Sequence, residues 1–466
     1  MRPAVVRNVW LCSMPRRLYE LGERKPRSTK GNSMKTLANN RILMLLENLP
    51  FPQDLRVRRE ALALAAAGYR VTVICQSASG QPSREMVNHV SVYRYPAPPV
   101  ANGFLGYVWE YGYSMLASFA LSLLVFLRDG FDVVHAHNPP DTFVLIATFY
   151  KLFGKRFVYD HHDLSPEMYQ ARFPGGGNRL VYAVLVLLEK LSCRMADHVI
   201  VTNEAYKKVA MERGRVPESR ITIVRNGIEL SRLDRPIEPD RALRQMGKTI
   251  IGYVGVMGVQ DGVDYLLRAL HHLVRVLGRT DFYCILIGGG DAWAGLQALA
   301  HDMALDEYVR FTGPVFGEGL LRYLSAADIC VDSAPSGPYS DRSTMFKIME
   351  YMSLSKPIVA FDLPEHRFTA QHAAVYVTPN DEGAFARALA QLMDDPGRRV
   401  TLGVFGSRRI RTRLAWDYSI PKLLGAYRTV LPAATKARRP LPQEAATGVQ
   451  SRHLAFTRTS GYKSGD

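Results

Sequence analysis

The sequence has few cysteines and no closely spaced cysteine pair. Five cysteines are spread over 466 residues, an odd number, and no two of them have the C-x-x-C spacing. This excludes a disulfide framework and a cysteine-based zinc site. Four of the five lie in apolar runs, so we expect small buried side chains in a reducing compartment. The cysteines are Cys12, Cys75, Cys193, Cys284 and Cys330.

The middle of the chain has little excess positive charge, although the formal net charge is +16. Residues 1–41 hold ten Lys and Arg against two acids, and residues 434–466 hold six against two. The residues between them therefore carry a net charge of only +4. A nucleic-acid-binding fold normally carries its basic patch on the fold itself. We therefore expect no nucleic-acid partner.

The two tails lack periodic apolar residues, which predicts disordered basic segments over 1–40 and 433–466. The first 30 residues contain no uninterrupted apolar core followed by a cleavage site, so we expect no secretory signal. Three interpretations of the tails stay open. They bind an anionic membrane surface, they act as solubilising segments, or, at the N-terminus, translation begins at Met34.

Short apolar runs alternate with helical patterns, which is typical of parallel α/β sheets. We predict an α/β fold with two Rossmann-like domains whose parallel sheets face each other across a cleft. The predicted boundaries are 41–230 for the N-terminal domain, 231–248 for a charged linker, 249–415 for the C-terminal domain and 416–432 for a closing helix. The predicted strands are 41–46, 70–76, 131–138, 155–163, 197–203, 221–227, 249–258, 282–290, 309–315, 327–335, 357–362 and 374–379.

The run 103–127 is apolar enough to resemble a membrane span, but Glu110 interrupts it. A span would also place the strands 41–46 and 131–138 on opposite sides of a bilayer, although both belong to one predicted sheet. We therefore expect a buried or interfacial helix.

The stretch SDRSTMFKIMEYMSLSKPIVAFD, residues 340–362, has polar residues around a predicted helix over 343–353. Ser343, Lys347 and Glu350 share one face of this helix, opposite a core stripe. This segment suits a diphosphate. The helix start offers free N–H groups, Ser343 and Thr344 offer hydroxyls, and Arg342 and Lys347 offer positive charge. Glu350, one turn further on, suits the 2′- and 3′-hydroxyls of a ribose. The alternative is a Lys–Glu pair on a solvated face. The core stripe is Met345, Ile348, Met349 and Met352.

Seven motifs in order resemble the retaining, nucleotide-sugar-dependent glycosyltransferases of family 4, which have the GT-B fold. They cover about residues 41–431 and are FDVVHAHNPPD, FVYDHHDLSPEMY, ADHVIVTN, ITIVRNGIE, GVMGVQDGVDYLLRAL, YVRFTGPV and STMFKIMEYMSLSKPIVAFD.

The resemblance implies roles for individual residues. His162 matches the histidine that faces the donor sugar and the acceptor. Glu350 matches the second glutamate of the glutamate–seven residues–glutamate motif, which holds the donor ribose, and both are candidate catalytic residues. Gly255 matches the glycine where the donor phosphates approach the backbone. The substrate is then a nucleotide-diphosphate sugar, with no cofactor.

The sequence also departs from the family pattern. Arg342 stands where the first glutamate of the paired motif is expected, and Val256 and Asp261 replace the phosphate-binding Arg and Lys. A donor diphosphate carries a charge of about −2 that must be balanced. Arg342 and Lys347 are the predicted replacements, so we expect a variant donor site of Gly255, Arg342, Ser343, Thr344, Lys347 and Glu350.

No Asp-x-Asp occurs in the sequence, whereas metal-dependent transferases of the other major fold hold their ion with that pair. We therefore predict a metal-independent hexosyltransferase, and the resemblance implies front-face retention. Acceptor-binding residues are predicted in the N-terminal domain: Asp54, Arg56, His137, Asn138 and Asp163. For Asp54 and Arg56 a solvated first loop is the alternative.

Three other interpretations stay open. The first is a zinc site formed by His135, His137, Asp160, His161 and His162. Against it, adjacent strand residues point to opposite faces. The second is a sugar-nucleotide epimerase of the same fold, and the third is a non-catalytic nucleotide-sugar-binding protein. We expect a cytoplasmic enzyme, peripheral on the inner face of the plasma membrane, that acts on a glycan or lipid-linked acceptor in polysaccharide or glycolipid biosynthesis.

Overall fold

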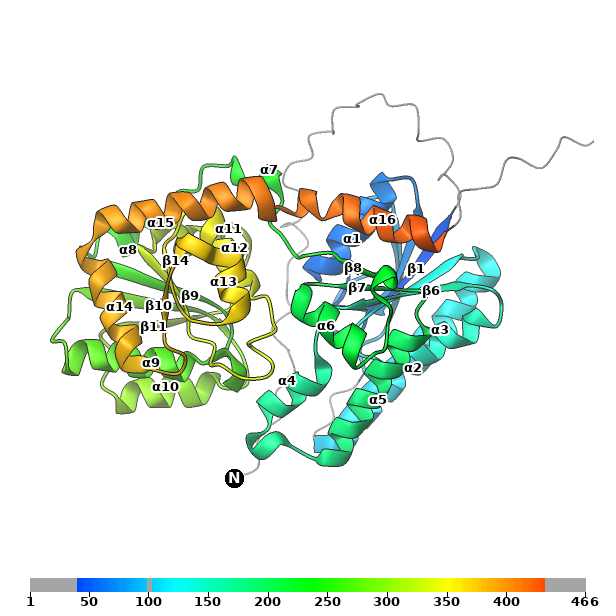
Figure 1. Cartoon of the computed structure of the whole chain (residues 1–466), viewed down its shortest axis with the longest axis horizontal. Coiled ribbons are helices and arrows are strands. Elements are labelled where there is room, and N and C mark those ends of the chain that lie inside the picture. Colours follow the sequence, from blue (N-terminus) through cyan, green and yellow to red (C-terminus); the bar gives the residue numbers. More distant parts are fainter. Residues whose placement is uncertain (1–39, 99–102, 432–466) are drawn as a thin grey trace, which may run out of the picture. The chain divides into compact units, whose positions relative to one another are not determined.

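The computed structural model describes residues 40–98 and 103–431, which form two separate β-sheets (Figure 1). The predicted disorder of the tails and the burial of Cys12 concern residues outside these ranges. The other four cysteines are buried and unpaired, as expected. Every strand predicted from the sequence is present, so the α/β class is confirmed.

The first sheet has eight strands in the order β3-β4-β2-β1-β5-β6-β7-β8. All neighbours are parallel except β3 and β4, a hairpin that the sequence did not predict. The strands are β1 Arg41–Leu45, β2 Arg70–Gln76, β3 Arg84–Val87, β4 Val90–Tyr95, β5 Val133–His137, β6 Arg156–His161, β7 His198–Val201 and β8 Ile221–Ile223.

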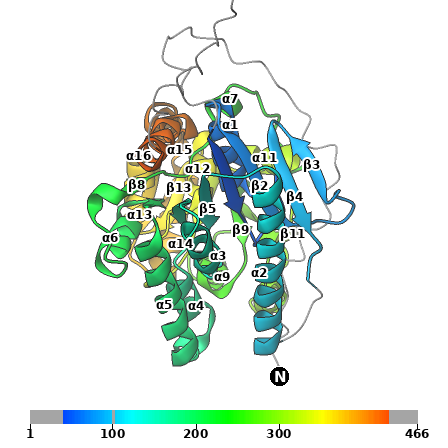
Figure 2. The ribbon, with the colours of Figure 1, turned by 90° about the vertical axis from the view of Figure 1, so that its right-hand side faces the viewer.

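Helices cover both faces of this sheet (Figure 2). One face packs against α1 (Leu55–Ala66) and α16 (Ile420–Val430). The other packs against a second set of helices, and α4 (Ser165–Arg172) links this layer to the end of β6. The second set is α2 Gly103–Arg128, α3 Phe143–Lys151, α5 Arg179–Met195 and α6 Glu204–Glu212.

The α2 helix confirms the predicted helix at 103–127, and its residues Trp109–Arg128 are long and apolar enough to cross a membrane. However, β1, which precedes α2, pairs directly with β5, which follows it, with Leu43 opposite Val134. A single crossing by α2 would separate these partners. The α2 helix therefore lies on the sheet in this fold.

The second sheet is parallel, with six strands in the order β11-β10-β9-β12-β13-β14. The strands are β9 Thr249–Val256, β10 Phe282–Gly289, β11 Val309–Gly313, β12 Ile329–Asp332, β13 Ile358–Phe361 and β14 Ala374–Val377. One face packs on α9 (Val263–Arg275), α10 (Trp293–Asp302) and α14 (Glu382–Asp394). The other packs on α11 (Gly317–Ala326), α12 (Phe346–Ser353), α13 (Pro364–Ala370) and α15 (Pro396–Arg409).

The connections between the two sheets are more ordered than predicted. The expected linker contains two short helices, α7 (Leu230–Leu233) and α8 (Arg241–Arg244). The closing helix α16 returns to the first sheet, where Leu423 and Tyr427 are fully buried. Its packing therefore belongs to the N-terminal core.

Candidate active site

His162 follows β6 and is held in place through both its backbone and its ring. Its backbone N–H donates to Asn138 Oδ1 at 2.8 Å, and its Nδ1 lies 3.0 Å from Asp160 Oδ2. The imidazole keeps 14% of its surface exposed. Burial by itself lowers the pKa of His162, but the Asp160 carboxylate outweighs it and raises the pKa to about 9. His162 is therefore an imidazolium at neutral pH.

Asp160 stays ionised beside His162 because the buried guanidinium of Arg56 binds both of its carboxylate oxygens. Arg56 donates from Nε to Asp160 Oδ2 at 2.7 Å and from its terminal nitrogen to Oδ1 at 2.6 Å. It also donates to the carbonyl of Val224 and the side chain of Asn226, just after β8. Burial opposes ionisation of Asp160, yet Arg56 and His162 hold its pKa well below the usual value. Asp160 is thus a fixed anion.

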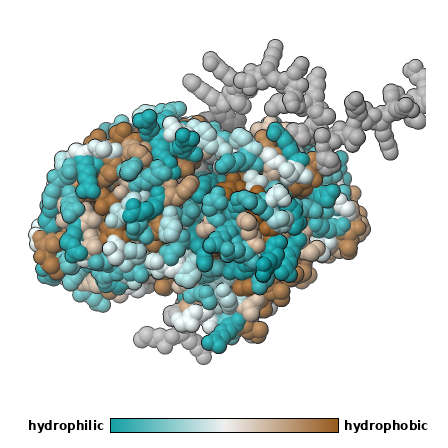
Figure 3. All heavy atoms as spheres, in the orientation of Figure 1, coloured by the Kyte–Doolittle hydropathy of each residue, from teal (hydrophilic) through white to brown (hydrophobic). Residues whose placement is uncertain are grey.

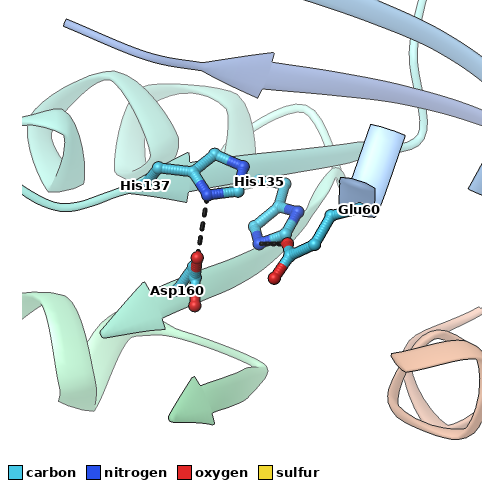
Figure 4. A group of neighbouring side chains, drawn as sticks. All are labelled: Glu60, His135, His137 and Asp160. Carbon is cyan, nitrogen blue, oxygen red and sulfur yellow. Dashed lines mark hydrogen bonds and ion pairs between the residues drawn. The ribbon is translucent and has the colours of Figure 1, made fainter. Parts of the chain in front are cut away.

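Four neighbouring side chains at this point could in principle hold a metal ion: Glu60, His135, His137 and Asp160 (Figure 4). His161, which the sequence analysis grouped with them, points to the opposite face of the sheet, where its Nε2 lies 2.7 Å from Glu189 Oε1. The Arg56 guanidinium binds both Asp160 oxygens and lies 3.1 Å from Glu60. This positive charge opposes a divalent cation beside it.

The same four groups are buried in mutual contact, with Glu60 Oε2 at 3.8 Å from His135 Nε2 and without a hydrogen bond of its own among the described residues. His137 Nδ1 lies 2.9 Å from Asp160 Oδ2, and the rings of His135 and His137 are 4.2 Å apart. His135 Nδ1 meets the hydroxyl of Tyr427, on α16, at 2.7 Å. Burial, and then the charge of Asp160, raises the pKa of Glu60 to about 8. A protonated Glu60 fits this network better than a second anion.

Most residues predicted to bind the acceptor have partners within the protein. Asp54 caps α1 by accepting from the Val57 N–H at 2.8 Å. Asn138 shapes the turn after β6, where its amide donates to the Asp163 carbonyl at 2.6 Å. Arg56, His137 and Asn138 are nearly inaccessible, with 6%, 1% and 1% of their surface exposed. Asp163 is half-buried beside His162, and burial raises its pKa. Acceptor binding by these residues stays a prediction.

The α12 helix begins at Phe346, so the predicted start at Ser343 is wrong. Ser343 and Thr344 lie in the preceding turn, where their hydroxyls donate to the Tyr339 carbonyl at 2.8 Å and to Glu365 Oε2 at 2.9 Å. Such local side-chain bonds compete with helix formation. The two hydroxyls therefore shape the loop before α12 and are not on its first turn.

Lys347 is buried and paired with two carboxylates, and its predicted role in balancing the charge of the donor diphosphate stays a prediction. Its Nζ lies 3.4 Å from Asp332 Oδ1 and 3.8 Å from Asp261 Oδ1, above the ring of Tyr253. Burial favours deprotonation, but the two carboxylates outweigh it and raise the Lys347 pKa. The sequence analysis did not identify Asp332, the last residue of β12, as a site residue. An acid at the end of a strand predicted to be buried could have indicated it.

Gly255 lies directly against this lysine. A Cβ there would come within 3.2 Å of Lys347 Cε and 3.1 Å of the Tyr253 hydroxyl. Across the sheet, a Cβ on Gly288 would overlap the Gly255 carbonyl at 1.9 Å. The two glycines allow the carboxyl edge of β9 and β10 to pack this closely.

Arg342 and Glu350 are both partly exposed members of the predicted donor site. Arg342 keeps 41% of its side chain exposed and lies 3.3 Å from Glu167 Oε1. Glu350 lines a pocket of about 260 Å³ together with Ile228, Arg232 and Leu321. Burial raises the Glu350 pKa to about 7, against the opposing charges of Arg232 and Arg59. A larger hollow of about 560 Å³ beside β14 and α15 contains none of the predicted site residues.

The family assignment follows from comparison with known proteins. The Glycosyltransferase Family 4 model matches residues 55–232, and the Glycosyl transferases group 1 model matches residues 248–395. The chain belongs to this family, a retaining family of nucleotide-sugar-dependent glycosyltransferases. The predicted family and its GT-B fold are therefore confirmed.

Relatives share modest identity with the chain. The uncharacterized glycosyltransferase MJ1607 of Methanocaldococcus jannaschii is 22% identical over 380 residues, covering 80% of this chain and 92% of that protein. The D-inositol 3-phosphate glycosyltransferase of Thermobispora bispora is 26% identical over 268 residues, covering 55% of this chain and 61% of that protein.

Solved structures have the same fold. Sucrose-phosphate synthase from Thermosynechococcus elongatus has a TM-score of 0.69 at 20% identity, covering 84% of this chain and 98% of that one. Anabaena HepE in complex with UDP-glucose has a TM-score of 0.62 at 16% identity, covering 83% and 99%. WaaG, a glycosyltransferase involved in lipopolysaccharide biosynthesis, has a TM-score of 0.63 at 15% identity, covering 84% and 100%.

Proposed function

We propose that this glycosyltransferase moves a hexose, with retention and without a metal ion, to a glycan or lipid-linked acceptor. The observation that carries the proposal is the Asp160–His162 pair, which presents a fixed imidazolium at the carboxyl end of β6. Ligands of open α/β sheets bind at this end of the strands. His162 would donate a hydrogen bond to the donor sugar and stabilise charge that develops during transfer.

The donor nucleotide would lie along the carboxyl edge of the second sheet. Glu350, on the second turn of α12, suits the ribose hydroxyls, because an ionised carboxylate only accepts hydrogen bonds. Gly255 gives the diphosphate access to the backbone, and Arg342 is the accessible cation of the predicted set. Because HepE binds UDP-glucose, UDP-sugars are the first donors to test.

One observation favours a non-catalytic nucleotide-sugar-binding protein as the second candidate. Asp261 and Asp332 neutralise Lys347, so the positive charge available to a leaving diphosphate is smaller than the sequence suggested.

Slow donor hydrolysis, with water as the acceptor, separates the two candidates. We expect proton NMR to detect the α-anomer as the first sugar released, before mutarotation, from an α-linked donor such as UDP-glucose in the presence of EDTA. His162→Ala should reduce this rate at least tenfold, whereas the exposed control Lys208→Ala should not. Binding without turnover for every hexose donor tested would favour the non-catalytic candidate. A β-anomer as the first product, before mutarotation, or a requirement for Mn²⁺ would contradict the mechanism.

We also propose a cytoplasmic location on the inner face of the plasma membrane and a role in cell-surface polysaccharide or glycolipid biosynthesis. The basic tails and the apolar surface of α2 support this location.

A further inference from the structure

The outward face of α2 is apolar along its whole described length. Its exposed residues recur every three or four positions, which places them on one side of the helix. Leu116 and Leu127 keep 73% and 83% of their surface exposed. The exposed positions from 109 to 127 are Trp109, Gly112, Leu116, Ala120, Leu124 and Leu127.

The α5 helix repeats this pattern, and α3 adds to the same surface. Both α2 and α5 run along one side of the first sheet, with α3 between them (Figure 2). Phe149 of α3 packs on Phe119 of α2, and α3 also contacts α5. Apolar residues reach the surface at the lower right of Figure 3, where Figure 1 places α2 and α5. We call the exposed apolar residues of this layer the helical face; besides those of α2 they are Leu145, Leu152, Phe153, Leu180, Ala183, Val184, Leu187 and Leu191.

The elements that form the helical face expose only positive charge, whereas the neighbouring helix α6 carries the exposed acids Glu204 and Glu212. Between residues 103 and 196 every exposed charged side chain is an arginine, and all eight acidic side chains are buried or half-buried. Arg179 stands at the start of the α5 stripe, Arg194 at its end and Arg128 at the end of the α2 stripe. Arginines at the ends of an apolar helix face can extend to phosphate groups while the apolar side chains enter a lipid layer. The other exposed arginines are Arg156 and Arg172.

We propose that the helical face docks on the surface of an anionic phospholipid bilayer, with α2 and α5 lying in the interface. The exposed apolar side chains and the positive exposed charge of residues 103–196 together match an acyl layer beneath anionic headgroups. The β1–β5 pairing excludes a single crossing by α2, so the contact is peripheral. This inference deepens the proposed membrane location by naming the surface that binds the bilayer, and it does not depend on the donor or on turnover.

Sedimentation of the full-length protein with vesicles tests the proposal. We expect binding to vesicles of phosphatidylglycerol and phosphatidylcholine in equal parts, and at least tenfold weaker binding to phosphatidylcholine alone. Leu116→Ser/Leu124→Ser and Leu180→Ser/Leu187→Ser should each weaken binding at least tenfold. The matched control Val400→Ser/Val404→Ser changes two exposed residues of α15, 66% and 59% exposed, and should bind like wild type. Circular dichroism melting verifies that all variants fold.

The outcomes are distinct because every variant keeps both basic tails. Wild-type-like binding by both helical-face variants would overturn the proposal and assign binding to the tails. A wild type that ignores anionic vesicles but forms a dimer that these variants break would make the face an interface between copies.

A second measurement reports how deeply α2 enters the lipid layer. Trp109, which is 51% exposed, should be quenched by lipids with brominated acyl chains, and Trp109→Phe should remove that signal. Equal quenching of both proteins would overturn the proposed insertion of α2.

Discussion

His161 and His162 are adjacent, but their rings serve different parts of the molecule. His161 pairs with Glu189 on the helical side, whereas His162 shares Asp160 with His137 and Arg56. Strand alternation separates the two rings. The sequence singled out His162 by family resemblance, but it did not reveal that a network starting at Arg56 sets its charge. The partners Arg56 and Asp160 are 104 residues apart, so local pattern could not pair them.

At the scale of the residue, we predict that Asp160→Asn lowers the pKa of His162. The carboxylate holds this pKa at about 9, above the ordinary 6.5, so its loss should shift the pKa down by more than about one unit. Histidine NMR titration measures this directly, and the alkaline limit of activity should move to lower pH with it. Asp163→Asn should give a smaller shift in the same direction. An unchanged His162 titration in Asp160→Asn would contradict the network.

The sign of the stability effect follows from the same shift. Because the folded-state pKa of His162 is raised, its interaction with Asp160 stabilises the fold fully below pH 6.5. That contribution is lost as the pH rises through about 9.

At the scale of the element, the closing helix α16 has the clearest structural role. The sequence predicted its amphipathic pattern, and the structure adds that it packs on the N-terminal sheet beside Ile42 and Val224. Sequence periodicity shows which face of a helix is apolar, but it does not show against which of the two domain cores that face packs.

Leu423→Ala should therefore destabilise the N-terminal core, because it leaves a cavity at a fully buried site. The expected loss is about 2–5 kcal/mol in the free energy of unfolding, as for other buried leucines. Urea denaturation of the full chain measures it. Lys422→Ala, at an exposed neighbouring position, serves as the control and should change stability by less than about 0.5 kcal/mol. A Leu423→Ala variant as stable as this control would show that α16 does not pack as described.

The β3–β4 hairpin marks a limit of sequence interpretation at this scale. Its turn uses Asn88 and His89, both with positive φ (46° and 66°), where the usual signal is Asn-Gly. The Asn was visible, but His is an uncommon second turn residue. The late start of α12 has a similar cause, since the bonds of Ser343 and Thr344 depend on the loop and on Glu365, 21 residues after Thr344.

At the scale of the whole molecule, the fold was predictable because both domains repeat one simple pattern. Twelve predicted strands are present, and the family order of seven motifs predicted the family and its GT-B fold. The charge balance at Lys347 was not predictable, because Asp261, Asp332 and Lys347 meet only after β9, β12 and α12 assemble.

Contacts between the N-terminal domain and the loop before α12 affect how a donor would be bound. Asn203, after β7, donates to the Arg342 carbonyl at 2.8 Å and to the Thr344 hydroxyl at 3.0 Å. Arg342 itself lies near Glu167 of α4. These contacts connect the loop that precedes α12 to the N-terminal domain, which carries His162. A donor bound at α12 would therefore act on a loop that contacts both domains.

Calorimetric titration of UDP, GDP and ADP on wild type and Glu350→Ala, without metal, tests the central claim most directly. We predict that one nucleotide binds and that Glu350→Ala weakens it at least tenfold, about 1.4 kcal/mol. Because the Glu350 pKa is about 7 and the ribose needs the ionised form, wild-type binding should strengthen from pH 6 to pH 8. Failure of all three nucleotides to bind, or equal binding by Glu350→Ala, would contradict a donor site at α12.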